Sequence, residues 1–160
     1  MDPGPPNTVP YQRANFATQL PTDYAYSPAH GWAARQAEGQ WRVGLTRFAT
    51  RMLGEIVDHG FQAKVGAPVQ VGEIIGWIEG FKAISDLYCL VEGRFLGGNP
   101  ALQQKPELVN QDPYGAGWLY QVEGVLDARC VDVAGYAAIL DATIDRLRQK
   151  QQAERPEAGG

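Results

Sequence analysis

The stretch "IEGFKAISDLYC", Ile78–Cys89, holds one lysine between two short segments that have the composition of β-strands. After the lysine the residues alternate, so that Leu87 and Cys89 fall on one face of a strand and their neighbours on the other. The connection between the segments is typical of a hairpin, in which Gly80 would supply the positive φ that tight turns require. We therefore expect Lys82 at the apex of a rigid two-stranded hairpin.

Short segments with strand-like alternation, separated by glycine and proline, continue on both sides of this hairpin. We predict a turn between two of them at Glu92 and Gly93. The predicted strands lie at residues 41–46, 55–61, 64–79 (two pieces), 83–98 (two pieces) and 118–122. Regular short strands of this kind predict a mainly β fold with helical additions, either a β-sandwich or a flattened barrel.

Helical signals appear in the middle of the chain and near its end. Residues 46–54 predict a two-turn helix, because Thr46 can cap its start and Gly54 can take the left-handed position after its end. Short helical turns are expected to begin at Asn99 and Pro106. An amphipathic helix is predicted over residues 132–150, where apolar residues recur at helical spacing. They are Val133, Tyr136, Leu140, Ile144 and Leu147.

The two ends of the chain differ from the middle. Residues 1–27 are rich in proline and polar residues, and we expect an extended arm, part of which packs on the domain through aromatic side chains. Residues 149–160 are polar and end in two glycines, so a disordered tail is expected there. The single domain, with its terminal helix, is therefore predicted to span residues 28–148.

The composition is that of a globular protein, since 44% of the 160 residues are hydrophobic and 20% are charged. A net charge of −4 argues against binding to nucleic acid. The amino terminus is unlike a signal peptide and no stretch is apolar enough to span a membrane, so we expect a cytoplasmic location. Cys89 and Cys130 are too isolated to indicate a disulfide framework or a zinc site, and neither His30 nor His59 has metal-ligand spacing.

By its pattern alone, a lysine in a turn is most often a structural surface residue. A catalytic lysine needs burial to lower its pKa, whereas a covalently modified lysine needs exposure and a rigid platform. The apex of a hairpin suits the second role. No Ser-His-Asp, Cys-His or phosphate-loop pattern accompanies Lys82, so we expect no catalytic residues and no free-standing enzyme. A scaffold in which Lys82 stays unmodified is the remaining alternative.

Two longer stretches carry a resemblance to a known family. "HGWAARQAEGQWRVGLTRFATRMLGEIV" (30–57) and "GEIIGWIEGFKAISDLYCLVEGRFLGGNPALQQKPELVNQDPYGAGWLYQV" (72–122) resemble the glycine cleavage system H protein family. The resemblance covers residues 24–123 and implies a lipoyl/biotinyl-type β-sandwich, a barrel-sandwich hybrid, with an added carboxy-terminal helical part. We reject a biotin carrier, because biotinyl domains flank the lysine with methionines, whereas Phe81 and Ala83 flank it here.

The resemblance implies that Lys82 carries lipoate in amide linkage and that the protein is a non-catalytic carrier. Its implied partners are a lipoate-attaching ligase or transferase, together with glycine decarboxylase, aminomethyltransferase and dihydrolipoyl dehydrogenase. In this family an acid precedes the lysine at the spacing of Glu79, so Glu79 and also Asp86 are expected to be recognised by the ligase or by a partner. His30 matches the family's histidine near the lipoate cavity, which implies a contact to the lipoyl arm.

Several positions depart from the usual family pattern. Gly80 and Phe81 replace the usual Ser-Val before the lysine, Gly31 replaces the acid of the usual His-Glu-Trp, and residues 58–61 replace Val-Glu-Leu-Pro. A second branch of H-like lipoate-binding proteins serves sulfur oxidation with a heterodisulfide-reductase-like complex and carries the same lipoyl-lysine. Sulfur oxidation therefore stays open as an alternative to glycine cleavage.

Overall fold

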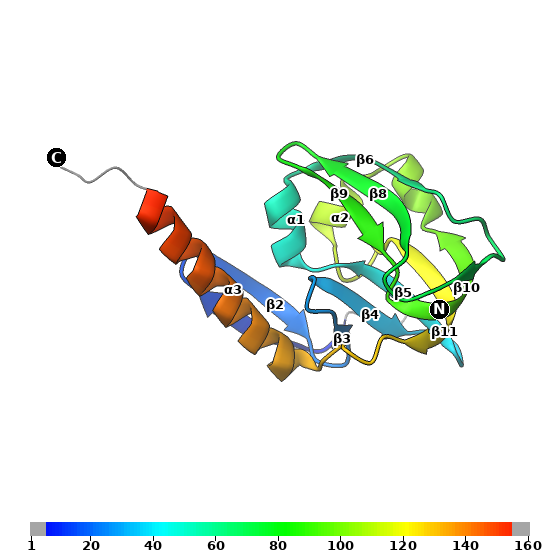
Figure 1. Cartoon of the computed structure of the whole chain (residues 1–160), viewed down its shortest axis with the longest axis horizontal. Helices are drawn as coiled ribbons and strands as arrows, with labels where there is room; N and C mark the ends of the chain where they lie inside the picture. The colour runs from blue at the N-terminus through cyan, green and yellow to red at the C-terminus, as the bar shows by residue number, and fades with distance from the viewer. Residues whose placement is uncertain (1–5, 155–160) are drawn as a thin grey trace, which may run out of the picture.

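The computed structural model describes residues 6–154, which form a mainly β body with a long terminal helix (Figure 1). The strand orders of its sheets are β1-β2, β3-β4-β5-β11-β10-β7 and β6-β8-β9. The strands are β1 (Thr8–Arg13), β2 (Phe16–Pro21), β3 (Ala25–Tyr26), β4 (Gly31–Arg35), β5 (Gln40–Leu45), β6 (Ile56–Phe61), β7 (Pro68–Val69), β8 (Ile74–Gly80), β9 (Ile84–Tyr88), β10 (Val91–Gly98) and β11 (Tyr120–Leu126). The helices are α1 (Arg47–Leu53), the 3-10 helix η1 (Pro100–Gln103), α2 (Leu108–Gln111) and α3 (Val133–Glu154). The predicted mainly β fold with a terminal helix is confirmed.

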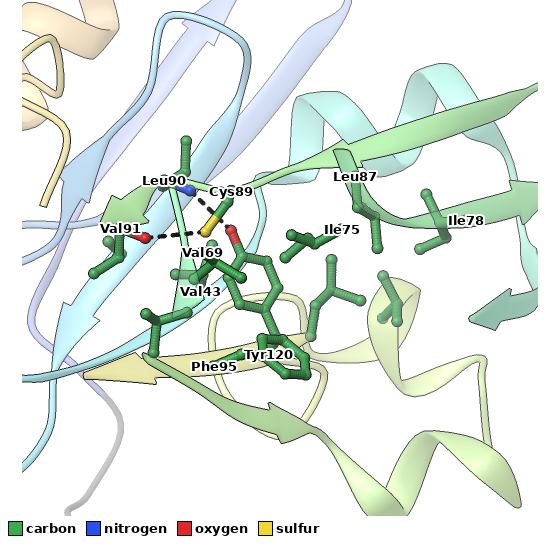
Figure 2. Packing of buried hydrophobic residues seen from close by; sticks show 14 of the residues in the cluster. Val43, Val69, Ile75, Ile78, Leu87, Cys89, Leu90, Val91, Phe95 and Tyr120 are labelled. Atoms are coloured by element: carbon green, nitrogen blue, oxygen red, sulfur yellow. Dashed lines mark hydrogen bonds between the residues drawn. The ribbon is translucent and has the colours of Figure 1, made fainter. Parts of the chain in front are cut away.

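The first hydrophobic core lies between the six-stranded and the three-stranded sheet, as Figure 2 shows from close by. Ile78 and Leu87 enter it from the three-stranded sheet, and Phe95 and Val122 enter it from the six-stranded sheet. Leu87 and Cys89 are both buried, which confirms the face assigned to them from the alternation of the sequence. Burial of these side chains on both sheets is what holds the sandwich together.

A second core lies on the other side of β4. Alternate residues of this strand point to opposite faces, so the strand contributes to both cores. Ala33 points into the first core, whereas Trp32 and Ala34 belong to the second. The second core is closed by the β1–β2 hairpin, α1 and α3. Its buried members are Phe16, Leu20, Tyr26, Trp32, Ala34, Phe48, Tyr136, Leu140 and Ile144.

The amino-terminal part of the chain differs from the extended arm expected for residues 1–27. Residues 8–21 fold back on themselves as an antiparallel hairpin, with Ala14 at a φ of 54° in its turn. Phe16 and Leu20 are buried, because one face of β2 packs in the second core with residues of α1 and α3. The hairpin lies alongside α3 (Figure 1), where Arg13 pairs with Asp145 at 2.7 Å. The segment is therefore part of the packed structure, and residues 1–5 lie outside the described part.

The terminal helix confirms the predicted spacing, since Tyr136, Leu140 and Ile144 are all buried. It is longer than expected, because α3 continues to Glu154. Residues 149–154 are thus helical, which corrects the disordered tail predicted from residue 149. The rest of that predicted tail, residues 155–160, lies outside the described residues.

The turn predicted at Glu92 and Gly93 is wrong. Both residues lie inside β10, where Gly93 is paired with Gly124 of β11. A side chain at Gly93 would overlap the backbone of Glu123, so this glycine allows two strands to approach closely. The chain instead changes sheets at residues 89–90, between β9 and β10, where Leu90 N donates to Tyr120 Oη at 3.1 Å.

Candidate functional site

The short helix α1 stands next to the lysine hairpin and begins and ends as its sequence predicts. Thr46 is its N-cap and is completely buried. Gly54 ends it with a φ of 80°, and its N–H donates to Thr50 O at 2.9 Å. The Thr46 cap is confirmed, and Gly54 ends the helix with the expected positive φ, although its ψ of −171° is extended and not that of a left-handed helical residue.

The end of α1 holds the turn that carries Lys82. The carbonyl oxygen of Leu53 accepts the backbone N–H groups of Lys82 (2.9 Å) and Ala83 (3.3 Å). The N–H of Phe81 donates to Glu55 O at 3.0 Å, and the N–H of Gly80 donates to Ala83 O at 2.9 Å across the turn. Helix ends leave carbonyl groups without partners inside the helix, and here the turn uses one of them. The apex is therefore fixed to a second element of the fold.

Gly80 has a different role from the one predicted. Its φ is not positive, but a Cβ at this position would overlap the carbonyl oxygen of Leu53. The glycine is required because the turn lies directly on the end of α1. Asn110 of α2 supports the same region from the other side, since it accepts from Ile56 N (2.8 Å) and donates to Gly54 O (3.1 Å).

Lys82 itself is exposed at the apex of the β8–β9 hairpin, as predicted. Within residues 6–154 its side chain forms no hydrogen bond and no ion pair, although the first carbons of its stem approach Gly54. The amine is thus free while the backbone beneath it is fixed. A free primary amine on a rigid, exposed turn can be acylated by an enzyme that reaches it.

The outer face of the three-stranded sheet β6-β8-β9 adjoins the lysine, because Lys82 lies at the apex between β8 and β9. Cross-strand pairing places Asp58, Glu79 and Ile84 in one row and Trp77 and Asp86 in the next. The two predicted recognition residues, Glu79 and Asp86, are both exposed on this face.

The apolar side chains on this face are unusually open for their size. Ile84 is 66% exposed and Phe81, at the apex, is 75% exposed. The strands β6, β8 and β9 contain no lysine or arginine. Their acidic side chains are Asp58, Glu79 and Asp86, and their one histidine is His59, whose pKa is lowered by burial. The face is therefore both apolar and acidic.

A cavity of about 330 Å³ opens on the inner side of the hairpin, between α1, β5 and the edge strand β9. Its lining is mainly apolar, with Phe48, Met52 and Leu53 from α1 and Leu87 from β9. Leu53 thus borders the cavity and also holds the lysine turn. A cavity of this kind can shelter an apolar chain of several atoms from water.

His30 also lines this cavity and is held in an unusual backbone conformation. Its φ is 72°, which is rare for a residue other than glycine. Its Nδ1 lies 2.9 Å from Tyr136 Oη, and its ring packs on Phe48 with a centroid distance of 4.7 Å. Burial lowers the pKa of His30 to about 4, so the imidazole is neutral near pH 7.

The remaining candidate residues lie away from the lysine turn. Cys89 is buried, its Sγ contacts Val91 O at 3.0 Å (Figure 2), and burial raises the pKa of its thiol. Cys130 is half-buried and burial raises its pKa to about 11. Burial lowers the pKa of His59, which lies on β6. Neither thiol has the lowered pKa of a reactive cysteine.

Two further properties concern the described chain as a whole. Between residues 6 and 154, no helix combines the length and the apolar character needed to cross a bilayer. In the same range, no three or more His, Cys, Asp or Glu side chains are grouped so that they could hold a metal ion.

Three features of the site were missed from the sequence. They are the support of the turn by Leu53, the bracing by Asn110, and the hydrogen bonds that join His30 to Tyr136 and Thr46. Each joins segments that are far apart in the chain, so no local pattern signals it. The one available hint was the polar residue Asn110 within the specific motif after Gly98.

Comparison with known proteins agrees with this geometry. A family model described as "Glycine cleavage H-protein" matches residues 24–134. The chain is 42% identical over 125 residues to the glycine cleavage system H protein of Mycobacterium avium, covering 78% of this chain and 92% of that protein. It is 40% identical over 124 residues to the corresponding protein of Corynebacterium jeikeium, covering 76% and 97%.

A solved structure is similar as well. The crystal structure of a glycine cleavage system H protein from Mycobacterium marinum superposes with a TM-score of 0.67 at 34% identity, covering 74% of this chain and 97% of that one. None of these relatives is described as a sulfur-oxidation protein, so that alternative gains no support. The chain belongs to the glycine cleavage H-protein family and is a non-catalytic lipoyl carrier.

Proposed function

We propose that Lys82 is the residue to which lipoate is attached in this carrier. The observation that carries the proposal is the free, exposed amine on a turn whose backbone N–H groups are bonded to the end of α1. The residues present fit the group, because nothing in residues 6–154 competes for the amine. When bound, lipoate would supply a dithiolane whose disulfide opens on attack by a nucleophile and re-forms on oxidation.

The protein's own part would be to mount the arm and to shelter its end. Leu53 and Glu55 hold the turn through backbone hydrogen bonds, so the arm swings from a fixed point. The cavity beside α1 would exclude water from the end of the arm, since most of its lining is apolar. His30 in its wall would contact the arm, as the family resemblance implies.

The chain is a component of the glycine cleavage system by family. We propose glycine decarboxylase, aminomethyltransferase and dihydrolipoyl dehydrogenase as the enzymes that the loaded carrier visits, together with a ligase or transferase that attaches lipoate. A heterodisulfide-reductase-like partner has no observation in its favour. The cytoplasmic location expected from the sequence stays a prediction, as does the extent of the carrier unit, residues 28–148.

We propose that the attaching enzyme binds the outer face of β6, β8 and β9. That enzyme must bring the amine of Lys82 itself into its active site, so its contacts are confined to the surface beside the apex. This surface presents Glu79 and Asp86 together with the open side chains of Phe81 and Ile84. A partner with an apolar patch and basic side chains would be complementary to it.

The test of attachment is the intact mass of the protein after expression with lipoate and an attaching enzyme. The wild type is expected to gain the mass of one lipoyl group, whereas Lys82→Arg should gain none, because a guanidinium is not nucleophilic at working pH. Lys105→Arg, at another exposed lysine, is the matched control and should be modified normally. Modification of Lys82→Arg would overturn the proposal.

The test of recognition is the rate of that modification. Glu79→Gln and Asp86→Asn should each slow lipoylation severalfold, and the double variant should slow it further. Glu92→Gln removes an exposed carboxylate from β10, outside the proposed surface, and should leave the rate unchanged. Equal rates for all of these variants would remove the recognition role from Glu79 and Asp86 while leaving attachment at Lys82 intact.

A further inference from the structure

Three polar groups from distant parts of the chain meet beside the cavity. Tyr136 Oη of α3 lies 2.9 Å from His30 Nδ1 and 2.7 Å from Thr46 Oγ1, the cap of α1. Tyr136 and Thr46 are completely buried. The Tyr136 ring stacks on Tyr26, with centroids 4.7 Å apart and planes 5° apart. The Tyr136 hydroxyl is thus held in place between its two partners.

The protons of these groups can be assigned by requiring that every buried donor has an acceptor. If Thr46 donates to Tyr136 Oη, then Tyr136 donates to His30 Nδ1, and both hydroxyl protons are used. In the opposite direction His30 would donate to Tyr136 and Tyr136 to Thr46. The Thr46 proton would then have no acceptor among the residues that the structure describes. A buried donor without an acceptor is unfavourable, so the first direction is favoured.

The backbone around His30 supports a fixed placement. His30 N donates to Ser27 O at 2.9 Å, and His30 O accepts from Thr46 N at 3.0 Å. These bonds hold the positive φ of His30 on both sides of the residue. With Nδ1 facing Tyr136, the other nitrogen, Nε2, makes no hydrogen bond with any described residue, while the ring lines the cavity.

From this arrangement we infer that Tyr136 is a positioning residue that holds His30 as the Nε2–H tautomer, an uncharged hydrogen-bond donor for the arm that enters the cavity. The ligand group is a hydrogen-bond acceptor, either a carbonyl oxygen or a sulfur of that arm. The inference rests on the proposed function for the identity of the arm, but the tautomer itself belongs to the unmodified chain. An uncharged donor suits a cavity with an apolar lining, where an imidazolium would be costly to bury.

The experiment is long-range proton–nitrogen NMR of the imidazole side chains, recorded on the unmodified full-length protein. The chain has two histidines, so a His59→Gln variant assigns the signals of His30. The wild type is expected to show a protonated Nε2 and an unprotonated Nδ1 at pH 7. A predominant Nδ1–H form would overturn the inference, whatever the state of Lys82.

Tyr136→Phe keeps the ring on Tyr26 and removes only the hydroxyl. In this variant His30 should become a mixture of tautomers and should titrate about one pH unit higher, because a bond to its neutral form is lost. Thr46→Val should act in the same direction, whereas Thr46→Ser retains a hydroxyl and should restore the wild-type spectrum. An unchanged His30 spectrum in Tyr136→Phe would remove the positioning role.

Tyr120→Phe is the matched control. Tyr120 is a buried tyrosine that lines the same cavity, but its hydroxyl bonds Leu90 N and Tyr88 O and not His30. Its loss should cost stability without changing the tautomer of His30. If Tyr120→Phe changes the tautomer as much as Tyr136→Phe, the effect is general loosening and the inference falls.

The acceptor is identified with two modified forms of Lys82. An octanoyl group offers the amide carbonyl without sulfur, whereas a lipoyl group offers both. A shift of the His30 Nε2–H signal in both forms supports a carbonyl acceptor, and a shift in the lipoyl form alone supports sulfur. No shift in either form, with modification confirmed by mass, would overturn the donor role. Absence of modification would instead contradict the proposed function.

Discussion

The two hydrophobic cores of this protein are built in different ways. The first core is mostly aliphatic and is filled by alternate residues of paired strands, with Ile78 and Leu87 beneath the lysine hairpin. The second is rich in aromatic rings, such as Phe16, Trp32 and Tyr136, and is closed by the β1–β2 hairpin and α3. The first core supports Lys82, whereas the second supports His30. The first core therefore supports both the lysine turn and much of the cavity wall, whereas the second core supports the part of that wall formed by His30 and Phe48.

The lysine turn and the amino-terminal hairpin are also held to the rest of the protein by different kinds of contact. Backbone hydrogen bonds to Leu53 hold the lysine turn, and these tolerate many side chains. Side-chain contacts hold the amino-terminal hairpin: Phe16 packs edge-on against Phe48 at 5.6 Å, and Arg13 pairs with Asp145. We therefore expect substitutions in the two regions to have separable effects.

The largest effect is expected for Leu87→Asp. Leu87 is buried in the first core, so the substitution places a carboxylate where no partner is available and should cost more than about 4 kcal/mol. The variant should fail to fold, as seen in amide NMR dispersion and urea unfolding. Tyr88→Asp, on the exposed face of the same strand, is the control and should fold normally. A cooperative transition at the wild-type midpoint for Leu87→Asp would contradict the assignment of this core.

Phe16→Ala should have the next largest effect. It removes a buried ring from the second core and should lower the free energy of unfolding by about 3 kcal/mol. Amide hydrogen exchange should accelerate in β1 and β2. At the Lys82 N–H, the free energy of opening should fall no more than the free energy of global unfolding does. Equal acceleration at the lysine turn would show that the two regions are not separable.

Gly80→Ala tests the lysine turn, the other of the two regions compared. The added methyl group overlaps the carbonyl of Leu53, so the turn must move away from α1, at a cost of about 2 kcal/mol. Exchange of the Lys82 and Ala83 amides should rise, whereas the β1–β2 hairpin should be unaffected. The same measurement made on Phe16→Ala provides the complementary control, and a pattern identical in both variants would refute this prediction.

The pH dependence of stability should report on His30. Its pKa is about 4 in the folded protein against an ordinary 6.5, so between these values the unfolded chain binds the extra proton. Its contribution is therefore fully present above pH 6.5 and is lost as the pH falls toward 4. With allowance for solvent screening, the loss should be roughly 1–2 kcal/mol. His30→Asn, which tolerates a positive φ, should show a smaller decrease in urea midpoint over this range. An identical decrease would exclude His30 as its source.

Arg13→Gln should have the smallest effect. The side chains of Arg13 and Asp145 are 40% and 44% exposed, and ion pairs that water reaches contribute little and are screened by salt. The melting temperature of the Arg13→Gln variant should therefore be slightly below that of the wild type at low salt and equal to it at high salt. Arg94→Gln, which breaks the exposed pair with Glu123, should behave alike. A loss as large as that of Phe16→Ala would mean that this ion pair, and not the buried ring, holds the hairpin to α3.

The sequence by itself determined the local features of this protein. Alternation predicted the buried face of β9, cap residues predicted the bounds of α1, and a lysine between two strands predicted the exposed apex. The specific motifs around Lys82 also predicted the family. These signals are local because strand period, helix caps and turns depend on residues within a few positions of one another.

Only the tertiary structure decided how the site is supported. Gly80 is needed for contact with Leu53 rather than for a positive φ, and residues 8–21 form a hairpin because Phe16 and Leu20 find a surface on α1 and α3. The contact between His30 and Tyr136 joins residues 106 positions apart. Hydrogen bonds across such separations depend on how whole elements pack, and no periodicity or spacing in one sequence records that packing.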